Sequence, residues 1–206
     1  MKILLIRHGE SEADLLKVHE GRADYPLTAE GIEQVKKLAN RVCNEFALEK
    51  IWASTLQRAS KTAAMLSEVI ECKVEYLDEL REHNNGDIAG KPLKEADDPF
   101  MLPPHIKWGT YGETRIEFRA SAEQALSQIL EQSKCYDQIA IVSHGGMISR
   151  LIESFLQLPI IHNKYFHTGD TGIHLLEINN LGYSIHYTNC TRHLREDASS
   201  KFSNGW

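Results

Sequence analysis

Two histidines follow two apolar stretches that lie far apart in the chain. Residues 3–6 (Ile-Leu-Leu-Ile) lead into Arg7, His8 and a glycine, and residues 139–143 lead into His144 and two glycines. Short apolar runs bounded by glycine predict buried strands. In open α/β sheets, groups that follow parallel strands meet at one edge, where sites form. We therefore expect the two imidazoles to do chemistry together at an exposed sheet edge.

Two arginines and a glutamate are predicted to reach the same edge. Arg58 follows a third apolar run, residues 51–54, and so emerges beside Arg7. One guanidinium group can bind two phosphate oxygens at once. Two guanidinium groups together with two imidazoles therefore predict a binding site for a tetrahedral dianion. Glu82 follows a fourth run, residues 74–77, and can supply a carboxylate there. Glu79 lies one helical turn away and is the alternative carboxylate.

The elements that position these residues alternate between strands and helices. A helix is expected after Thr28, a suitable N-cap, because residues 32–46 repeat apolar side chains every three or four positions. Similar spacing predicts helices over residues 59–70 and 115–132, and a last helix that ends before Pro159. Residues 83–114 lack periodicity and are rich in proline, which is typical of a loop that covers a site.

The predicted fold class is α/β. Residues 172–178 and 183–189 flank Asn-Asn-Leu-Gly at 179–182, which predicts a β-hairpin. Together with the alternating elements, this indicates a three-layer α/β/α sandwich with a mostly parallel central sheet and an antiparallel strand near the C-terminus. We expect a single domain over residues 1–195 and a frayed polar tail at 196–206.

Composition excludes several classes of protein. The 206 residues are 42% hydrophobic and 25% charged, which is ordinary for a globular domain. The formal charge of -6 disfavours nucleic-acid binding, and no run approaches the ~20 apolar residues of a membrane span. Neither a secretory signal nor a disulfide or zinc spacing among the four cysteines is found. We expect a cytoplasmic protein with no metal site, since the histidines also lack metal-ligand spacing.

The ordered motifs resemble the histidine phosphatase superfamily, which includes cofactor-dependent phosphoglycerate mutases and many small phosphatases. Each motif is weak alone, but together they run from the start of the chain to about residue 155. The matching segments are Arg7-His8-Gly9-Glu10-Ser11, Gly21, Asp24, Pro26-Leu27-Thr28, Gly31, Ser54-x-Leu56-x-Arg58-Ala59-x-x-Thr62-Ala63, Leu80-x-Glu82-x-x-x-Gly86, Gly112-Glu113-Thr114 and Ser143-His144-Gly145-Gly146.

The resemblance implies a phosphoglycerate mutase-like fold and a role for each motif residue. His8 is the expected phosphoryl acceptor and Glu82 the proton donor and acceptor. Arg7, Arg58 and His144 form the expected phosphate clamp, with His144 contributing charge if it is protonated. Further substrate contacts are expected at Ser11, Asp14, Gly21 and Gly145.

The chemistry of these roles has its own requirements. A nucleophilic histidine needs one unprotonated ring nitrogen, while the other donates its proton to a fixed acceptor, here a carbonyl near Gly9. The clamp stabilises charge on the transferred phosphoryl group, and a general acid protonates the leaving alcohol. The scheme needs no cofactor and no metal.

Asp14 departs from the family pattern, which often has an asparagine there. An ionised carboxylate repels phosphate, so Asp14 turns away, stays protonated or accepts from a substrate hydroxyl. Arg22 is a candidate for a second anionic group or a solvated loop charge, and Trp108 is expected to anchor the loop.

Three functions fit these residues. The first is a phosphatase acting on a small phosphorylated metabolite, because the 30 residues between Glu82 and Glu113 are short for a mutase of this family. The second is a mutase, an isomerase that moves a phosphoryl group. The third is a non-catalytic domain that binds a phosphorylated ligand. A homodimer remains open in each case.

Overall fold

The computed structural model describes residues 1–95, 102–160 and 164–195. The predicted tail at 196–206 and residues 96–101 of the predicted loop therefore lie outside the described residues. The strands are β1 (Lys2–Arg7), β2 (Lys50–Ser54), β3 (Val74–Leu77), β4 (Gln138–Ser143), β5 (Ile173–Asn179) and β6 (Gly182–Cys190). The α-helices are α1 (Glu12–Leu16), α2 (Ala29–Glu45), α3 (Gln57–Ile70), α4 (Arg115–Gln132) and α5 (Gly145–Phe155).

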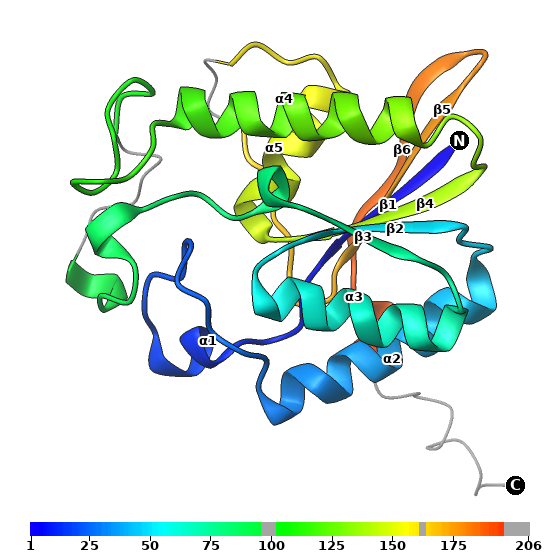
Figure 1. Cartoon of the computed structure of the whole chain (residues 1–206), viewed down its shortest axis with the longest axis horizontal. Coiled ribbons are helices and arrows are strands. Elements are labelled where there is room, and N and C mark those ends of the chain that lie inside the picture. The colour runs from blue at the N-terminus through cyan, green and yellow to red at the C-terminus, as the bar shows by residue number, and fades with distance from the viewer. Residues whose placement is uncertain (96–101, 161–163, 196–206) are drawn as a thin grey trace, which may run out of the picture.

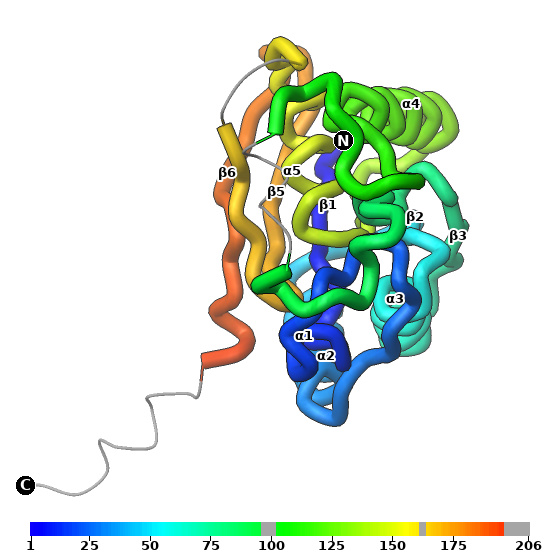
Figure 2. Tube along the Cα trace, turned by 90° about the vertical axis from the view of Figure 1, so that its left-hand side faces the viewer, coloured from blue at the N-terminus to red at the C-terminus, as the bar shows by residue number. Residues whose placement is uncertain are grey.

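The described strands form one six-stranded sheet in the order β3-β2-β4-β1-β5-β6. The first four strands along the chain are mutually parallel, while β5 runs antiparallel to both β1 and β6. Figure 2 shows the β5–β6 hairpin at one edge of the sheet and β3 at the other. The predicted α/β class, mostly parallel sheet and late antiparallel strand are therefore confirmed.

Alternating side chains of β1 pack on opposite faces of the sheet. Ile3 and Leu5 join the core under α4 and α5, whereas Leu4 and Ile6 join the core under α2 and α3. Figure 1 shows these two pairs of helices on the two sides of the strands. Because both faces are covered, β1 and β4 are continuous apolar runs, as expected for parallel strands buried on both sides.

Threonine caps begin the two longest helices. The Thr28 hydroxyl accepts from Gly31 N at 2.9 Å at the start of α2, as predicted. Thr114 forms a capping box with Glu117 at the start of α4. The short helix α1 was not predicted, because its five residues are too few to show a helical repeat.

The end of the sheet where β1 and β4 finish is surrounded by loops. In Figure 1, α1 and the 3₁₀ turns at Gly86–Ile88 and Leu93–Glu95 lie together at this end. Backbone hydrogen bonds join the two segments, since His19 N donates to Lys91 O and Gly90 N donates to His19 O, both at 2.8 Å. Within the described ranges, no helix is long and apolar enough to cross a membrane.

Candidate active site

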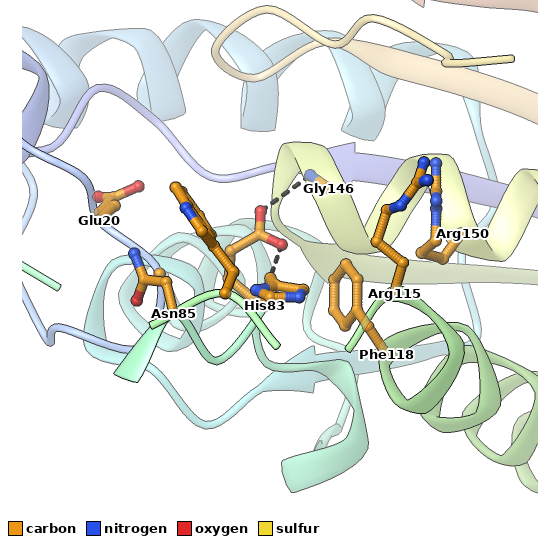
Figure 3. Close-up of a pocket in the computed structure, with 10 residues that line it drawn as sticks. Glu20, His83, Asn85, Arg115, Phe118, Gly146 and Arg150 are labelled. Atoms are coloured by element: carbon orange, nitrogen blue, oxygen red, sulfur yellow. Dashed lines mark hydrogen bonds between the residues drawn. The ribbon is translucent and has the colours of Figure 1, made fainter. Parts of the chain in front are cut away.

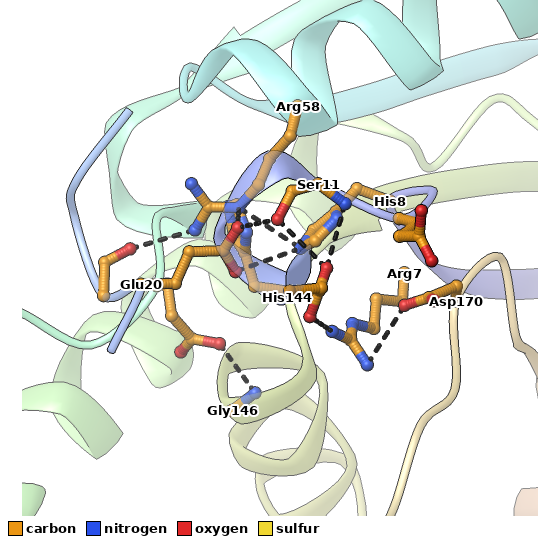
Figure 4. A network of polar contacts seen from close by, with 12 residues as sticks. Arg7, His8, Ser11, Glu20, Arg58, His144, Gly146 and Asp170 are labelled. Atoms are coloured by element: carbon orange, nitrogen blue, oxygen red, sulfur yellow. Dashed lines mark hydrogen bonds and ion pairs between the residues drawn. The ribbon is translucent and has the colours of Figure 1, made fainter. Parts of the chain in front are cut away.

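The pairing of β1 with β4 brings the two histidines together. Arg7 is in register with Ser143, and His8 N donates to the Ser143 carbonyl at 3.1 Å. The centroids of the His8 and His144 rings lie 5.1 Å apart, with their planes at 59° (Figure 4). Each residue is only 1% exposed. The expectation of an exposed sheet-edge imidazole was therefore wrong, because the loops over this edge bury both rings.

The hydrogen bond of His8 to its own neighbour determines its tautomer. Nδ1 lies 2.7 Å from the Gly9 carbonyl, which can only accept, so Nδ1 carries the proton. Burial, together with the charges of Arg58 and Arg7, holds the pKa of His8 well below its usual value. The ring is neutral at physiological pH, and Nε2 keeps the lone pair that a nucleophile requires.

The Arg58 guanidinium lies next to Nε2 of His8. Its Nε lies 3.2 Å from His8 Nε2, while Nη1 and Nη2 donate to the carbonyls of Ala23 and Gly21 at 3.0 and 2.9 Å. The side chain is fully buried. Gly21 has φ +49°, and a Cβ there would lie 1.8 Å from the Asn85 amide oxygen, so only glycine lets the loop close on Arg58. The role of Gly21 in this structure is therefore to accept a hydrogen bond from Arg58 with its backbone carbonyl.

Arg7 is held between the end of β1 and the turn before β5. Its Nη1 donates to the Thr168 carbonyl at 2.9 Å and lies 3.4 Å from an Asp170 carboxylate oxygen. Its Nη2 lies 3.8 Å from Asp14. Figure 4 shows the Arg7 guanidinium beside Asp170. Each clamp arginine therefore faces at least one carboxylate of the protein itself, Asp170 for Arg7 and Glu20 for Arg58.

His144 does not supply a positive charge here. Burial, with the charges of Arg58 and His8 next, holds the pKa of His144 well below its usual value. Its Nε2 pairs with the Ser54 hydroxyl at 2.8 Å, and its buried Nδ1 has no hydrogen-bond partner in the described part of the chain. The condition under which His144 would add charge to the clamp is therefore disfavoured, and the neutral ring keeps one polar atom, Nδ1, to offer to a ligand.

Glu82, and not Glu79, faces the site. Glu82 accepts from Gly146 N and His83 N, both at 2.8 Å, and so rests on the N-terminus of α5. Glu79 points to Gln124 on α4, at 3.5 Å. A Cβ on Gly146 would lie 2.5 Å from a Glu82 carboxylate oxygen, so the glycine is needed for this close approach. A Cβ on Gly145 would meet nothing nearer than 3.7 Å.

A cavity of about 210 Å³ opens beside Glu82. Figure 3 shows Phe118 facing it, with Arg115 and Arg150 at the far end from Glu20 and Asn85. Trp108 lines the cavity and also packs against His19 and His83, with ring centroids 5.1 and 5.8 Å apart. The expected anchor of the loop is therefore also a wall of the pocket.

Arg22 is bound to the protein itself. Its Nε donates to the Glu82 carbonyl and its Nη2 to Glu113, both at 3.1 Å. These contacts support the backbone that carries Glu82, so Arg22 is neither a solvated loop charge nor, in this arrangement, directed at a second anion.

Asp14 turns toward the backbone at the start of α1. Its Oδ2 accepts from Ser11 N at 2.9 Å and from the Ser11 hydroxyl at 3.0 Å. One carboxylate oxygen of Asp14 thus caps α1, while the other lies 3.8 Å from Arg7 Nη2. Ser11 is fully buried between Asp14 and Glu20.

Sequence reasoning missed two carboxylates of this site. Glu20 lies between Arg58 and Ser11, and Asp170 lies against Arg7. Burial raises the pKa of both groups, and the nearby arginines oppose the shift. The one local signal for Glu20 is its place immediately before Gly21 in a loop that must close on Arg58. Among the described residues, no cluster of three or more metal-ligating side chains is present.

The sequence of the chain matches the histidine phosphatase superfamily (branch 1) over residues 3–191. The chain belongs to this family. Among curated relatives, it is 30% identical over 169 residues to the adenosylcobalamin/alpha-ribazole phosphatase of Escherichia coli, covering 77% of this chain and 81% of the relative. It is 29% identical over 166 residues to a probable phosphoglycerate mutase of Escherichia fergusonii, covering 77% and 76%.

Solved structures show the same fold. The alpha-ribazole phosphatase of Shigella flexneri superposes with a TM-score of 0.83 at 27% identity, covering 93% of this chain and 97% of that one. A phosphoserine phosphatase variant from Entamoeba histolytica, in complex with phosphoserine, gives a TM-score of 0.81 at 25% identity, covering 94% and 99%. This member of the family is thus similar to both phosphatases and mutases.

Proposed function

We propose that this histidine phosphatase family member hydrolyses a small phosphomonoester through a phosphohistidine on His8. One observation carries the proposal. The carbonyl of Gly9 fixes the proton on Nδ1, so the lone pair of Nε2 faces the guanidinium of Arg58 in a buried space. An unprotonated imidazole nitrogen beside a buried cation is the arrangement that attack on a phosphorus atom requires.

In the first step, the Nε2 lone pair of His8 forms a bond to phosphorus while the ester P–O bond breaks. The leaving oxygen takes the proton of Glu82, and the alcohol departs into the cavity beside that residue. Arg7 and Arg58 stabilise the charge on the transferred oxygens. The neutral His144 ring contributes a hydrogen bond from Nδ1 when the Ser54 hydroxyl donates to Nε2.

In the second step, water attacks phosphorus and the N–P bond breaks. Glu82 takes the proton of the water, which returns the carboxyl group to its starting state and regenerates the His8 lone pair. Inorganic phosphate then leaves. General acid–base catalysis of this kind contributes about 10²- to 10⁴-fold in rate.

The pocket supports a small organic leaving group. Its volume is about 210 Å³, and its lining includes the aromatic side chains of Trp108 and Phe118 as well as Arg115 and Arg150. Similarity to an adenosylcobalamin/alpha-ribazole phosphatase and to a phosphoserine phosphatase also supports a small phosphorylated metabolite as substrate.

A mutase is the second candidate, because the chain is nearly as identical to a probable phosphoglycerate mutase, at 29%, as to the alpha-ribazole phosphatase, at 30%. The two activities share the phosphohistidine and differ in the acceptor, which is water in one and a second hydroxyl group in the other. A non-catalytic phosphate-binding domain would keep Arg7 and Arg58 without any turnover.

The test is phosphate release from a panel of phosphorylated metabolites without added metal. We expect release from at least one small phosphomonoester, and no release by His8→Ala whose fold is verified by circular dichroism. Isomerisation of 3-phosphoglycerate that depends on a bisphosphate primer would favour the mutase. Phosphate binding with no turnover across the panel would favour the binding domain, and equal activity of His8→Ala would remove the nucleophile assignment.

A further inference from the structure

The Glu20 carboxylate fills the space in front of the proposed nucleophile. Its Oε1 lies 3.1 Å from Arg58 Nε and 2.5 Å from the Ser11 hydroxyl, and its Oε2 lies 3.8 Å from His8 Nε2 (Figure 4). We call the space bounded by these three partners the anion seat. A phosphorus atom attacked by His8 must approach Nε2 to about 3–3.5 Å. The phosphoryl group and the Glu20 carboxylate therefore compete for one position.

The Ser11 hydroxyl lies between two carboxylates and can donate to only one of them at a time. The Ser11 hydroxyl carries one proton, but oxygens of two carboxylates, Asp14 at 3.0 Å and Glu20 at 2.5 Å, lie within hydrogen-bond distance. When Glu20 is ionised, one of these contacts has no proton. When Glu20 is neutral, it donates to Ser11, and Ser11 donates to Asp14. Burial raises the pKa of Glu20, although the charge of Arg58 and a hydrogen bond donated by Ser11 act in the opposite direction. The neutral carboxyl group is therefore reached at a higher pH than in an exposed glutamate.

The other titratable and charged groups around Glu20 come from several parts of the fold. Arg7 and His8 lie at the end of β1, Arg58 on α3 and Asp14 on α1. Glu82 and His83 line the same cavity as Glu20, and His144 lies behind His8. The pKa values of His8 and His144 are held well below the usual value, and that of His83 is lowered to about 4, mainly by burial in each case. Protonation of each of these three rings is therefore disfavoured by the fold, whereas protonation of Glu20 is favoured.

We infer that Glu20 is an internal competitor for the phosphoryl group, and that a tetrahedral dianion enters the anion seat only as Glu20 takes up a proton. A dianion and an ionised carboxylate repel each other at this separation, whereas a protonated carboxyl group donates a hydrogen bond to the entering oxygen. Glu20 is thus a binding residue that makes affinity depend on pH. The inference rests on the proposed function only in taking the anion seat as the phosphoryl site.

Sulfate is the suitable probe, because it is a tetrahedral dianion that neither titrates near neutral pH nor reacts. Isothermal titration calorimetry at constant ionic strength, from pH 5.5 to 8.5 and in two buffers of different ionisation enthalpy, gives both affinity and proton uptake. We expect the affinity of the unmodified protein to fall as pH rises, by up to about tenfold per pH unit where one proton is taken up.

Glu20→Gln keeps the size of the side chain and removes its charge. We expect this variant to bind sulfate at least about tenfold more tightly than the unmodified protein at pH 8, with no pH dependence and no proton uptake. Glu20→Ala, which empties the seat, is expected to behave in the same way and guards against a defect specific to the amide. Glu12→Gln is the matched control, because it removes an exposed glutamate from nearby α1 and should follow the unmodified protein.

Three outcomes would overturn the inference. Weaker sulfate binding by both Glu20 variants would mean that Glu20 positions Arg58 for the ligand. If sulfate binding by Glu20→Gln kept its pH dependence, the proton would be taken up by another group. If only Asp170→Asn lost the pH dependence, that group would be Asp170. Failure of the proposed function is recognised separately, as an absence of phosphate release while sulfate binding follows the pattern given above.

Discussion

Gly146→Ala tests the role of Glu82 as the general acid, because the three atoms nearest the added methyl group all belong to the Glu82 carboxyl group. A Cβ on Gly146 would lie 2.5 Å from one Glu82 carboxylate oxygen and 3.1 Å from the other. To regain an ordinary contact, the carboxylate must move by about 1 Å, and a misplacement of that size can cost about 10²-fold in rate. The backbone itself is not strained, since positive φ is not found at Gly146.

The fold is expected to tolerate Gly146→Ala. The group that must yield is the end of a flexible side chain, and alanine is about 1 kcal/mol more favourable than glycine within a helix. The damage should therefore fall on proton transfer. We expect kcat/KM for an alkyl phosphate to fall about 100-fold. The fall for 4-nitrophenyl phosphate should be less than about tenfold, because that leaving group departs without a proton.

The matched comparison is Gly145→Ala, one residue earlier in the same helix. Its Cβ would meet no atom nearer than 3.7 Å, so Glu82 keeps its place. Any effect of Gly145→Ala on phosphate binding should change alkyl and aryl rates by the same factor. The assay is phosphate release from both substrates by each variant. An equal loss on both substrates in Gly146→Ala, or no loss on either, would refute the assignment of Glu82 as the acid.

Further predictions concern the acid, the clamp and the buried histidines. Glu82→Gln should reduce kcat/KM for alkyl phosphates by about 10² or more and spare aryl phosphates, and a uniform reduction would count against it. Arg58→Lys should weaken sulfate binding, measured by calorimetry, because one ammonium group cannot serve the Gly21 and Ala23 carbonyls and a ligand together; unchanged affinity would contradict this. Burial lowers the pKa of His83 and His174 to about 4, so the unfolded chain takes up protons first as pH falls. The free energy of unfolding should reach its full value above about pH 6.5 and be lower by about 2 kcal/mol per ring at pH 4.5. Urea unfolding would contradict this if its midpoint stayed constant over that range.

The sequence was sufficient to predict the layers of the fold and the convergence of its main site residues. Both follow from the same regularity, because apolar runs mark parallel strands and parallel strands end at one edge. His8, Arg58 and His144 were placed in this way, and Thr28 was recognised by its residue type as a cap. Helix α1 escaped prediction because a single turn carries no repeat.

The rest of the site depends on how loops fold over that edge. Burial of His8 and neutralisation of His144 arise from loop packing, which residue types do not encode locally. Glu20 and Asp170 could not be foreseen for the same reason, since an acidic residue in a loop is usually solvated. Asp14, which was singled out as a departure, is explained only by its contacts with Ser11 and Arg7.

The central claim is that the phosphoryl group passes through Nε2 of His8. Glu82→Gln treated with an aryl phosphate should accumulate this intermediate, because transfer needs no acid while hydrolysis lacks its base. Quenching in alkali and recording phosphorus–nitrogen couplings by NMR on protein with ¹⁵N-labelled histidine would locate the bond. We predict a single phosphoryl group on Nε2 of His8. A phosphoryl group on Nδ1 or on another residue, or aryl alcohol release with no phosphorylated protein, would contradict the claim.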